Sequence, residues 1–236
     1  MLVVLALAAA TVTTVATSRG EQPLQVYLPA HVATPAKPPV LLLSGEGGWR
    51  SFDDRLARWL SDAGYPVGGI DCMKYFWKPQ DDRGALAADV ALFAAAIAKQ
   101  SGHGGAVPCI LAGYSFGADL APWIAGAPGR PPAAAALVLV GPDLKGSLEA
   151  RISEILGLAS DAHTFDTAAA LRDAAAVPVL FIHGGSDRSS AAPALASGFT
   201  GKKELIVVPG ATHHFAGHEE ELRRALIDGL DRLLAR

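Results

Sequence analysis

The feature that most constrains the fold of this chain is the alternation of short apolar runs with longer segments of helical spacing. The runs are bounded by glycine and proline, which is typical of strands buried on both faces of a sheet. They are Leu24–Leu28, Val40–Leu43, Pro66–Ile70, Val107–Ala112, Ala136–Val140, Val177–Ile182 and Leu205–Val208. Strands that alternate with helices predict an α/β fold, in which a mostly parallel sheet of about seven strands is covered by helices on both faces.

Three segments have clear helical patterns. One begins at Ser51, which we expect to be the N-cap because acidic residues follow in the first turn. Ala85–Lys99 is rich in alanine, and Glu219–Leu234 has the apolar side of an amphipathic helix.

The alternation is less regular between Leu144 and Ala176. Two short helical patterns, Leu148–Leu158 and Thr167–Ala175, lie there between predicted strands. The segment is either a small cap over a site, which we favour, or an ordinary crossover, so a small cap or none is expected.

The composition excludes several classes of protein. Half of the 236 residues are hydrophobic, and the formal net charge is −3 with no basic patch, so binding to nucleic acid is not expected. The two cysteines, Cys72 and Cys109, are too few for a disulfide framework or a four-ligand zinc site. We expect no metal and no cofactor. Without an internal repeat or a long linker, residues 21–236 are predicted to form one domain.

The chain begins with an unusual apolar run, Leu2–Ala10, and its first charged residue is Arg19. The run is too short to cross a bilayer, which takes about 20 residues. It fits the apolar region of a secretory signal, although no basic residue precedes it. We therefore expect a signal peptide over residues 1–20, and the alternative is a buried strand around Thr11–Val15.

A nucleophile motif follows the apolar run Val107–Ala112. Gly113-Tyr-Ser-Phe-Gly117 has the pattern G-x-S-x-G and lies directly between that predicted strand and a helical segment. Such a turn holds Ser115 in a strained conformation, and the glycines remove side chains that would clash. The hydroxyl then projects from the carboxyl edge of the sheet beside a helix N-terminus, where negative charge is favoured. Ser115 is the predicted nucleophile.

A serine hydroxyl needs a general base near neutral pH, and the chain order for this geometry is serine, acid, histidine. Asp187 follows the predicted strand Val177–Ile182 and is the candidate acid, with Asp143 as the alternative. The pair His213 and His214 follows the last predicted strand, and we favour His213 as the base.

These residues predict acyl transfer to water through an acyl-enzyme. The oxyanion needs two backbone donors. One is expected to be the N–H of Phe116, directly after the nucleophile, and the other the N–H of Glu46 or Gly47 in the glycine-rich loop after Val40–Leu43.

Four segments of the sequence resemble one known family. LLLSGEGGW, GYPVGGIDCMKYFW, GYSFGADLAP and HHF are similar to the bacterial virulence protein VirJ family, which is related to the C-terminal part of AcvB. The similarity covers most of residues 38–234, and Glu46 stands where the family usually has aspartate. The resemblance implies an α/β-hydrolase fold, export to the periplasm, hydrolysis of lysyl-phosphatidylglycerol and support of virulence and DNA-transfer machinery.

The resemblance also implies residues that bind the substrate. Glu46 would pair with an ammonium group of an aminoacyl ester, and an aromatic run would form an apolar wall for a lipid or touch the membrane surface. That run is Tyr75, Phe76 and Trp77, and further candidates are Trp49 and Asp119. The alternatives are a solvated Glu46, core positions for the aromatic residues and a structural hydrogen bond for Asp119.

The leading hypothesis is a periplasmic serine hydrolase that acts on a small-molecule or lipid ester. The resemblance implies an aminoacylated phospholipid as its substrate and secretion-system proteins as possible partners. The alternatives are a general carboxylesterase resembling dienelactone hydrolases and a non-catalytic, secretion-associated binding protein. A cytoplasmic location is the alternative to export, and the sequence leaves the oligomeric state open.

Overall fold

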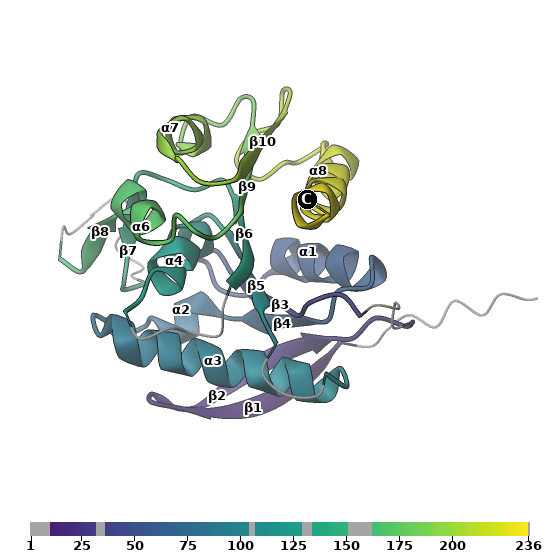
Figure 1. Cartoon of the computed structure of the whole chain (residues 1–236), viewed down its shortest axis with the longest axis vertical. Coiled ribbons are helices and arrows are strands. Elements are labelled where there is room, and N and C mark those ends of the chain that lie inside the picture. Colours follow the sequence, from purple (N-terminus) through teal and green to yellow (C-terminus); the bar gives the residue numbers. More distant parts are fainter. Residues whose placement is uncertain (1–9, 32–35, 104–106, 129–133, 151–161, 236) are drawn as a thin grey trace, which may run out of the picture.

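The computed structural model describes residues 10–31, 36–103, 107–128, 134–150 and 162–235. Its centre is an eight-stranded sheet with the order β1-β2-β4-β3-β5-β6-β9-β10 (Figure 1). The first two strands pair antiparallel to their neighbours, and the other pairs are parallel. In sheet order the strands are Thr11–Thr17, Gly20–Tyr27, Val67–Ile70, Val40–Leu43, Cys109–Tyr114, Ala134–Val140, Val179–Gly184 and Lys203–Val208.

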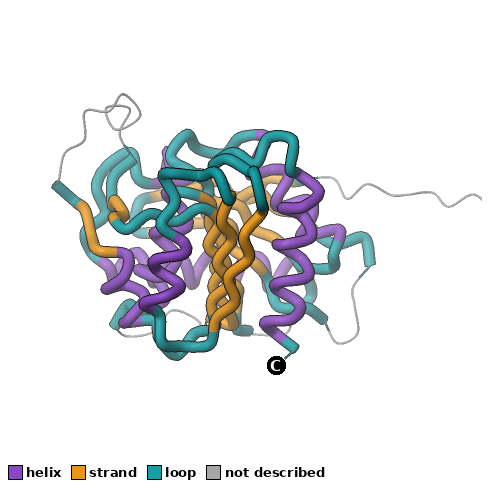
Figure 2. Tube along the Cα trace, turned by 90° about the horizontal axis from the view of Figure 1, so that it is seen from above, coloured by secondary structure: helices purple, strands orange, loops and turns teal. Residues whose placement is uncertain are grey.

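Helices cover both faces of this sheet, and Figure 2 shows the strands between the two helical layers. One face carries α1 (Ser51–Asp62) and α8 (Glu219–Leu234). The other carries α2, α3, α4, α6 and α7, which are Cys72–Tyr75, Arg83–Gln100, Phe116–Ala125, Thr167–Asp173 and Ala192–Gly198. No helix in the described ranges is both long and apolar enough to cross a membrane.

Strand β3 shows why the predicted runs are apolar throughout. Leu41 and Leu43 belong to the core on the α3 and α4 side, whereas Val40 and Leu42 belong to the core on the α1 and α8 side. All four are at most 2% exposed, because successive side chains of a strand point to opposite faces and both faces are covered. The predicted α/β fold with its mostly parallel sheet is confirmed, with slightly more strands than expected.

The additional strand is β1, which forms an antiparallel hairpin with β2 at one edge of the sheet. This is the strand that the alternative interpretation expected around Thr11–Val15, although only Val15 is buried. Residues 11–20 are therefore part of the folded sheet in this structure. The apolar residues 1–9 lie outside the described residues, and the signal peptide over residues 1–20 stays a prediction.

Two local expectations were wrong. Helix α1 has Arg50 as its N-cap and Ser51 as its first residue, because the Asp53 carboxylate accepts the Arg50 N–H at 2.9 Å and begins the helix one residue earlier. Leu148 and Glu149 lie in a bend and Ala150 is not helical, while the rest of the Leu148–Leu158 pattern lies outside the described residues.

The segment between Leu144 and Ala176 contains a two-stranded ribbon and one helix. The ribbon pairs β7 (Lys145–Ser147) with β8 (Thr164–Asp166), and α6 follows directly. Since α6 packs against α4 on the face of the sheet, it is the crossover helix from β6 to β9 (Figure 1). The described part of the segment is thus an ordinary crossover.

The β1–β2 hairpin is tied to the rest of the domain through one buried carboxylate. Asp89 of α3 is 2% exposed and accepts the Ser18 N–H and Ser18 hydroxyl, each at 2.7 Å. It also accepts the Tyr75 hydroxyl at 2.6 Å. Arg19, beside Ser18, donates to the carbonyls of Lys78 and Pro79. The turn of the hairpin is therefore held by α3 and by the loop after α2.

Replacing Asp89 by alanine is expected to lower the free energy of unfolding by about 3 kcal/mol, because buried donors lose their charged acceptor. The matched control is Leu92→Ala in the same helix. Because Leu92 is 46% exposed, its replacement should change the free energy of unfolding by less than about 0.5 kcal/mol. Urea denaturation of both variants makes the comparison, and equally small losses would show that Asp89 does not hold the hairpin.

Candidate active site

Ser115 lies in a strained turn between β5 and α4, with φ 51° and ψ −119°. A positive φ is unfavourable for a residue with a side chain and is kept only where its surroundings impose it. The surroundings are tight here. A Cβ atom at Gly113 would lie 2.1 Å from the Gly117 carbonyl oxygen, and one at Gly117 would lie 2.2 Å from the Leu43 oxygen. The two glycines of the motif are thus required by the approach of β3, β5 and α4.

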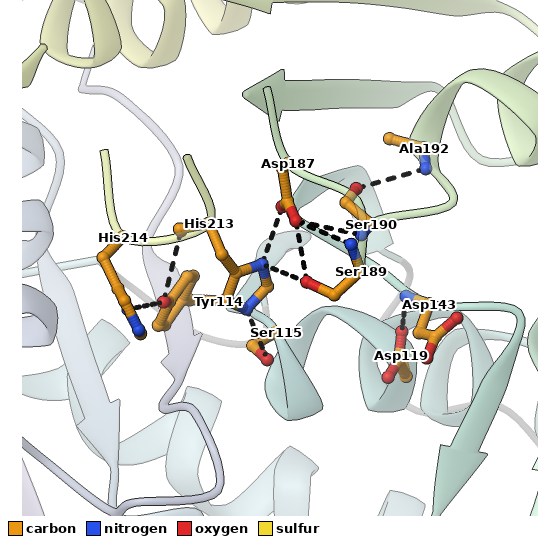
Figure 3. Close-up of polar contacts among 10 residues, drawn as sticks. All are labelled: Tyr114, Ser115, Asp119, Asp143, Asp187, Ser189, Ser190, Ala192, His213 and His214. Carbon is orange, nitrogen blue, oxygen red and sulfur yellow. Dashed lines mark hydrogen bonds and ion pairs between the residues drawn. The ribbon is translucent and has the colours of Figure 1, made fainter. Parts of the chain in front are cut away.

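The predicted nucleophile, base and acid form one hydrogen-bonded chain (Figure 3). His213 Nε2 lies 2.9 Å from Ser115 Oγ, and His213 Nδ1 lies 2.7 Å from Asp187 Oδ2. The ring has room because Gly141 faces it, where a Cβ atom would lie 3.0 Å from His213 Cε1. This is the geometry by which a serine hydroxyl can be deprotonated and used to transfer an acyl group.

Asp187 is buried and fully supplied with donors. Its Oδ1 accepts the Ser189 hydroxyl at 2.7 Å and the N–H groups of Ser189 and Ser190 at 2.9 and 3.2 Å. Burial acts to raise the pKa of Asp187, but the hydrogen bonds from Ser189 and His213 outweigh it and hold the pKa below its usual value. The carboxylate therefore stays ionised and can stabilise a protonated His213.

The alternative acid does not reach the imidazole. Asp143 is exposed, its N–H donates to Asp119 Oδ1 at 2.7 Å, and its Oδ1 accepts the N–H of Leu144. Both aspartates lie apart from the His213 ring in Figure 3. The structure thus brings Asp187, and not Asp143, to the histidine.

The alternative base points elsewhere as well. His214 Nδ1 lies 2.8 Å from the Tyr114 hydroxyl, which also donates to the His213 carbonyl at 3.3 Å. The Tyr114 ring packs against His213, with 5.2 Å between the ring centres. Tyr114 and His214 therefore hold the loop that carries the base, and only His213 contacts Ser115.

The predicted oxyanion loop lies across a groove from the histidine loop. A turn closed by the Gly48 N–H to the Gly45 carbonyl carries Glu46 and Gly47 at its tip. The groove has a volume of about 280 Å³ and contains Ser115. Its lining residues are Gly45, Glu46, Gly47, Gly48, Arg50, Phe52, Asp53, Tyr114, Ser115, His213 and His214.

The N–H of Phe116 also has the placement expected of an oxyanion donor. Phe116 is the first residue of α4, directly after Ser115, and the first N–H groups of a helix have no acceptor within the helix. The positive end of the helix dipole lies at the same point. Phe116 on one side and the tip of the Gly45–Gly48 turn on the other are thus the candidate donors.

Asp53 fixes both ends of the oxyanion loop. Its side chain accepts the N–H of Gly45 at 3.4 Å and the N–H of Arg50 at 2.9 Å, and the residue is only 3% exposed. Burial raises the pKa of Asp53 to about 6, against the lowering effect of these two hydrogen bonds.

The predicted substrate-binding residues are dispersed. Glu46 is exposed at the groove and Trp77 is 55% exposed. The prediction that Tyr75 and Phe76 form an apolar wall for the substrate was wrong, because both side chains are buried in the core between α3 and the sheet. Trp49 does not line the groove either, since its indole covers Gly69, where a Cβ atom would lie 2.1 Å from the ring.

Asp119 has the structural role that the alternative interpretation gave it. It is buried in α4 and accepts the Asp143 N–H. Burial raises its pKa well above the usual value. Within the described ranges, no group of three or more His, Cys, Asp or Glu side chains is arranged to hold a metal ion.

Sequence reasoning missed several residues of the site. Ser189 was not identified, although an Asp-x-Ser sequence is typical of a turn in which the carboxylate accepts the serine N–H. Tyr114 lies inside the nucleophile motif, but its contact with the histidine loop has no sequence signal. The same holds for Asp53 and Arg50, because their positions depend on how the loop after β3 folds back on α1.

His213→Ala is expected to lower kcat for 4-nitrophenyl acetate by about 10⁴-fold, because proton transfer from Ser115 to the imidazole is lost. His214→Ala is the matched control, with a loss of about tenfold or less, since His214 only holds the loop. Steady-state kinetics measures both, with thermal unfolding to confirm that each variant is folded. Similar losses in two folded variants would contradict the assignment of His213 as the base.

The pKa of Asp53 predicts a pH dependence of stability. Between its unfolded pKa near 4 and its folded pKa near 6, the native state binds more protons than the unfolded state. The free energy of unfolding should therefore fall as the pH rises through this window, by roughly 3 kcal/mol. Urea denaturation at pH 4, 5, 6 and 7 should show that Asp53→Asn removes this part of the slope, and an unchanged slope would refute the shift.

Comparison with solved structures shows the same fold over nearly the whole chain. Est1E from Butyrivibrio proteoclasticus has a TM-score of 0.68 at 15% identity, covering 95% of this chain and 99% of that one. XC6422 from Xanthomonas campestris, described as an α/β serine hydrolase without a lid, has a TM-score of 0.63 at 21% identity, covering 96% of each chain. Dienelactone hydrolase from Anabaena variabilis has a TM-score of 0.65 at 18% identity, covering 94% and 96%.

These likenesses identify the architecture as the α/β-hydrolase fold. A search among curated proteins found no significant match. The comparison with protein families matches residues 39–234 to the bacterial virulence protein VirJ. Since this match includes the nucleophile turn, the oxyanion loop and the histidine loop, the chain belongs to the VirJ family.

Proposed function

We propose that this protein is a serine hydrolase that cleaves carboxylic esters through Ser115, His213 and Asp187. The observation that carries the proposal is the chain of short hydrogen bonds, 2.9 Å and 2.7 Å, from a serine in a strained turn to a buried carboxylate. A strained serine at the N-terminus of a buried helix has no evident structural purpose, whereas it presents the hydroxyl to a substrate.

The chemistry follows from these contacts. His213 Nε2 takes the proton of the Ser115 hydroxyl as Oγ attacks the ester carbonyl, and Asp187 stabilises the imidazolium that forms. The N–H groups of Phe116 and of Glu46 or Gly47 stabilise the oxyanion. His213 then gives its proton to the leaving alcohol. Water attacks the acyl-enzyme with His213 again as the base, which releases the acid and restores Ser115.

We further propose that the ester is an aminoacylated phospholipid such as lysyl-phosphatidylglycerol, met in the periplasm. Membership of the VirJ family supports this, and so does the position of Glu46. Its carboxylate is exposed at the groove that contains Ser115. There it can attract the ammonium group of an aminoacyl ester, although an exposed pair contributes only about 1 kcal/mol or less.

A small soluble ester is the second candidate. The observation in its favour is the burial of Tyr75 and Phe76. It removes most of the apolar wall that a lipid chain would contact, and the groove of about 280 Å³ suits a small group.

A fluorophosphonate probe is expected to label the folded wild-type protein at Ser115, with Ser115→Ala as the unlabelled control. Lysyl-phosphatidylglycerol in detergent micelles should then release free lysine in the presence of the wild type and not of the variant. Mass spectrometry of the labelled peptide and an amino-acid assay provide the readouts. Failure to label would reject the hydrolase proposal, and labelling without release of lysine would leave the small ester as the substrate.

A further inference from the structure

The groove at Ser115 is lined by one arginine, Arg50, whose side chain and backbone each make a hydrogen bond. Arg50 Nε donates to the Gly47 carbonyl at 2.7 Å, and the Arg50 backbone N–H donates to the buried Asp53 carboxylate at 2.9 Å. An exposed arginine normally loses rotational freedom when it binds a ligand. In Arg50 part of that freedom is already lost, because its Nε is held by the oxyanion loop and its backbone N–H by Asp53 of α1.

The terminal nitrogens of Arg50 have no carboxylate within ion-pair distance among the described residues. Many other arginines of the domain do form such pairs; they are Arg55, Arg58, Arg83, Arg223 and Arg232. Arg50 also lies in the same groove as Ser115 and His213. Arg50, whose guanidinium is held and has no ion-pair partner among the described residues, therefore borders the groove in which an ester would bind.

The chemistry of the triad tells which part of the ester meets this cation. His213 Nε2 must protonate the leaving alkoxide, so the alcohol part lies on the His213 side of Ser115. The groove runs between the histidine loop and the oxyanion loop, and Arg50 belongs to its lining. A group on the alcohol part that extends across this groove therefore comes to the loop that carries Arg50.

We propose that Arg50 forms an anion subsite that binds an oxyanion on the alcohol part of the ester, either a phosphodiester or a carboxylate. The planar fork of a guanidinium matches two oxygens of either group. Glu46, which lines the same groove, carries the opposite charge and can attract an ammonium group on the acyl part of the same ester. This inference rests on the proposed function and deepens it.

Kinetics with three acetyl esters tests the subsite. The alcohols are glycerol, glycerol methyl phosphodiester and glyceric acid, so the three esters differ only in the substituent at one end of the three-carbon unit. The wild type should favour the phosphodiester or the carboxylate over the neutral ester by about tenfold in kcat/KM, and the ester that gains identifies the anion. In Arg50→Gln this ratio should fall to about one, and Arg50→Lys should keep part of it.

Arg188→Gln is the matched control. Arg188 is also exposed and without an ion pair among the described residues, but it does not line the groove, so the ratio should stay as in the wild type. An unchanged ratio in Arg50→Gln would overturn the proposal. Equal losses on all three esters would overturn it too, because they would assign Arg50 to holding the oxyanion loop.

A binding measurement separates the subsite from the hydrolase proposal. Calorimetry with glycerol methyl phosphodiester or glycerate on Ser115→Ala should detect binding of at least one of them, and Ser115→Ala with Arg50→Gln should weaken it at least tenfold. If the wild type cleaves none of the esters, the proposed function fails. The calorimetric comparison of Ser115→Ala with the double variant then tests by itself whether Arg50 binds the anion. Absence of binding in Ser115→Ala would overturn it.

Discussion

The close approach of three backbone segments at Ser115 is the constraint on which the rest of the structure depends. Strand β5 must turn into α4 within one residue while the backbone of β3 passes 2.2 Å from where a Cβ of Gly117 would be. This packing forces the positive φ of Ser115 and puts its hydroxyl above the carboxyl ends of the parallel strands. The loops after β3, β9 and β10 begin at those same ends, so the oxyanion loop, the acid and the base converge on the serine.

Three buried carboxylates near this point do different work because their surroundings differ. Asp187 receives hydrogen bonds from Ser189 and His213 that keep its pKa low, and it orients the imidazole. Asp53 is desolvated, with a pKa of about 6, and closes the oxyanion loop on α1. Asp119 has a raised pKa and joins α4 to the loop after β6. Of these three carboxylates, only that of Asp187 hydrogen-bonds to His213.

The sequence predicts the layered α/β fold because buried parallel strands are apolar on both faces, as Val40–Leu43 illustrates. It also predicts Ser115, Asp187 and His213, since motif spacing and chain order reflect the order of the strands. Edge strand β1 has one buried residue and no comparable apolar run, so its pattern could not be told from that of a cleaved leader. Burial of Tyr75 and Phe76 depends on how α3 covers the sheet, and an aromatic run has the same pattern in a core or at a surface. Contacts such as that of Asp53 with Gly45 arise only when a loop closes.

Gly141 shows how an absent side chain takes part in the site. Its N–H is fixed by the Ile182 carbonyl at 3.0 Å, so the backbone between β6 and β9 cannot withdraw from the imidazole. In the proposed reaction His213 would first accept the proton of Ser115 and then donate it to the departing alcohol, two positions that a small rotation of the ring would connect. A methyl group at position 141 would lie 3.0 Å from His213 Cε1 and would restrict such a movement. The space beside His213 is therefore set by a neighbouring strand end that contributes no functional group of its own.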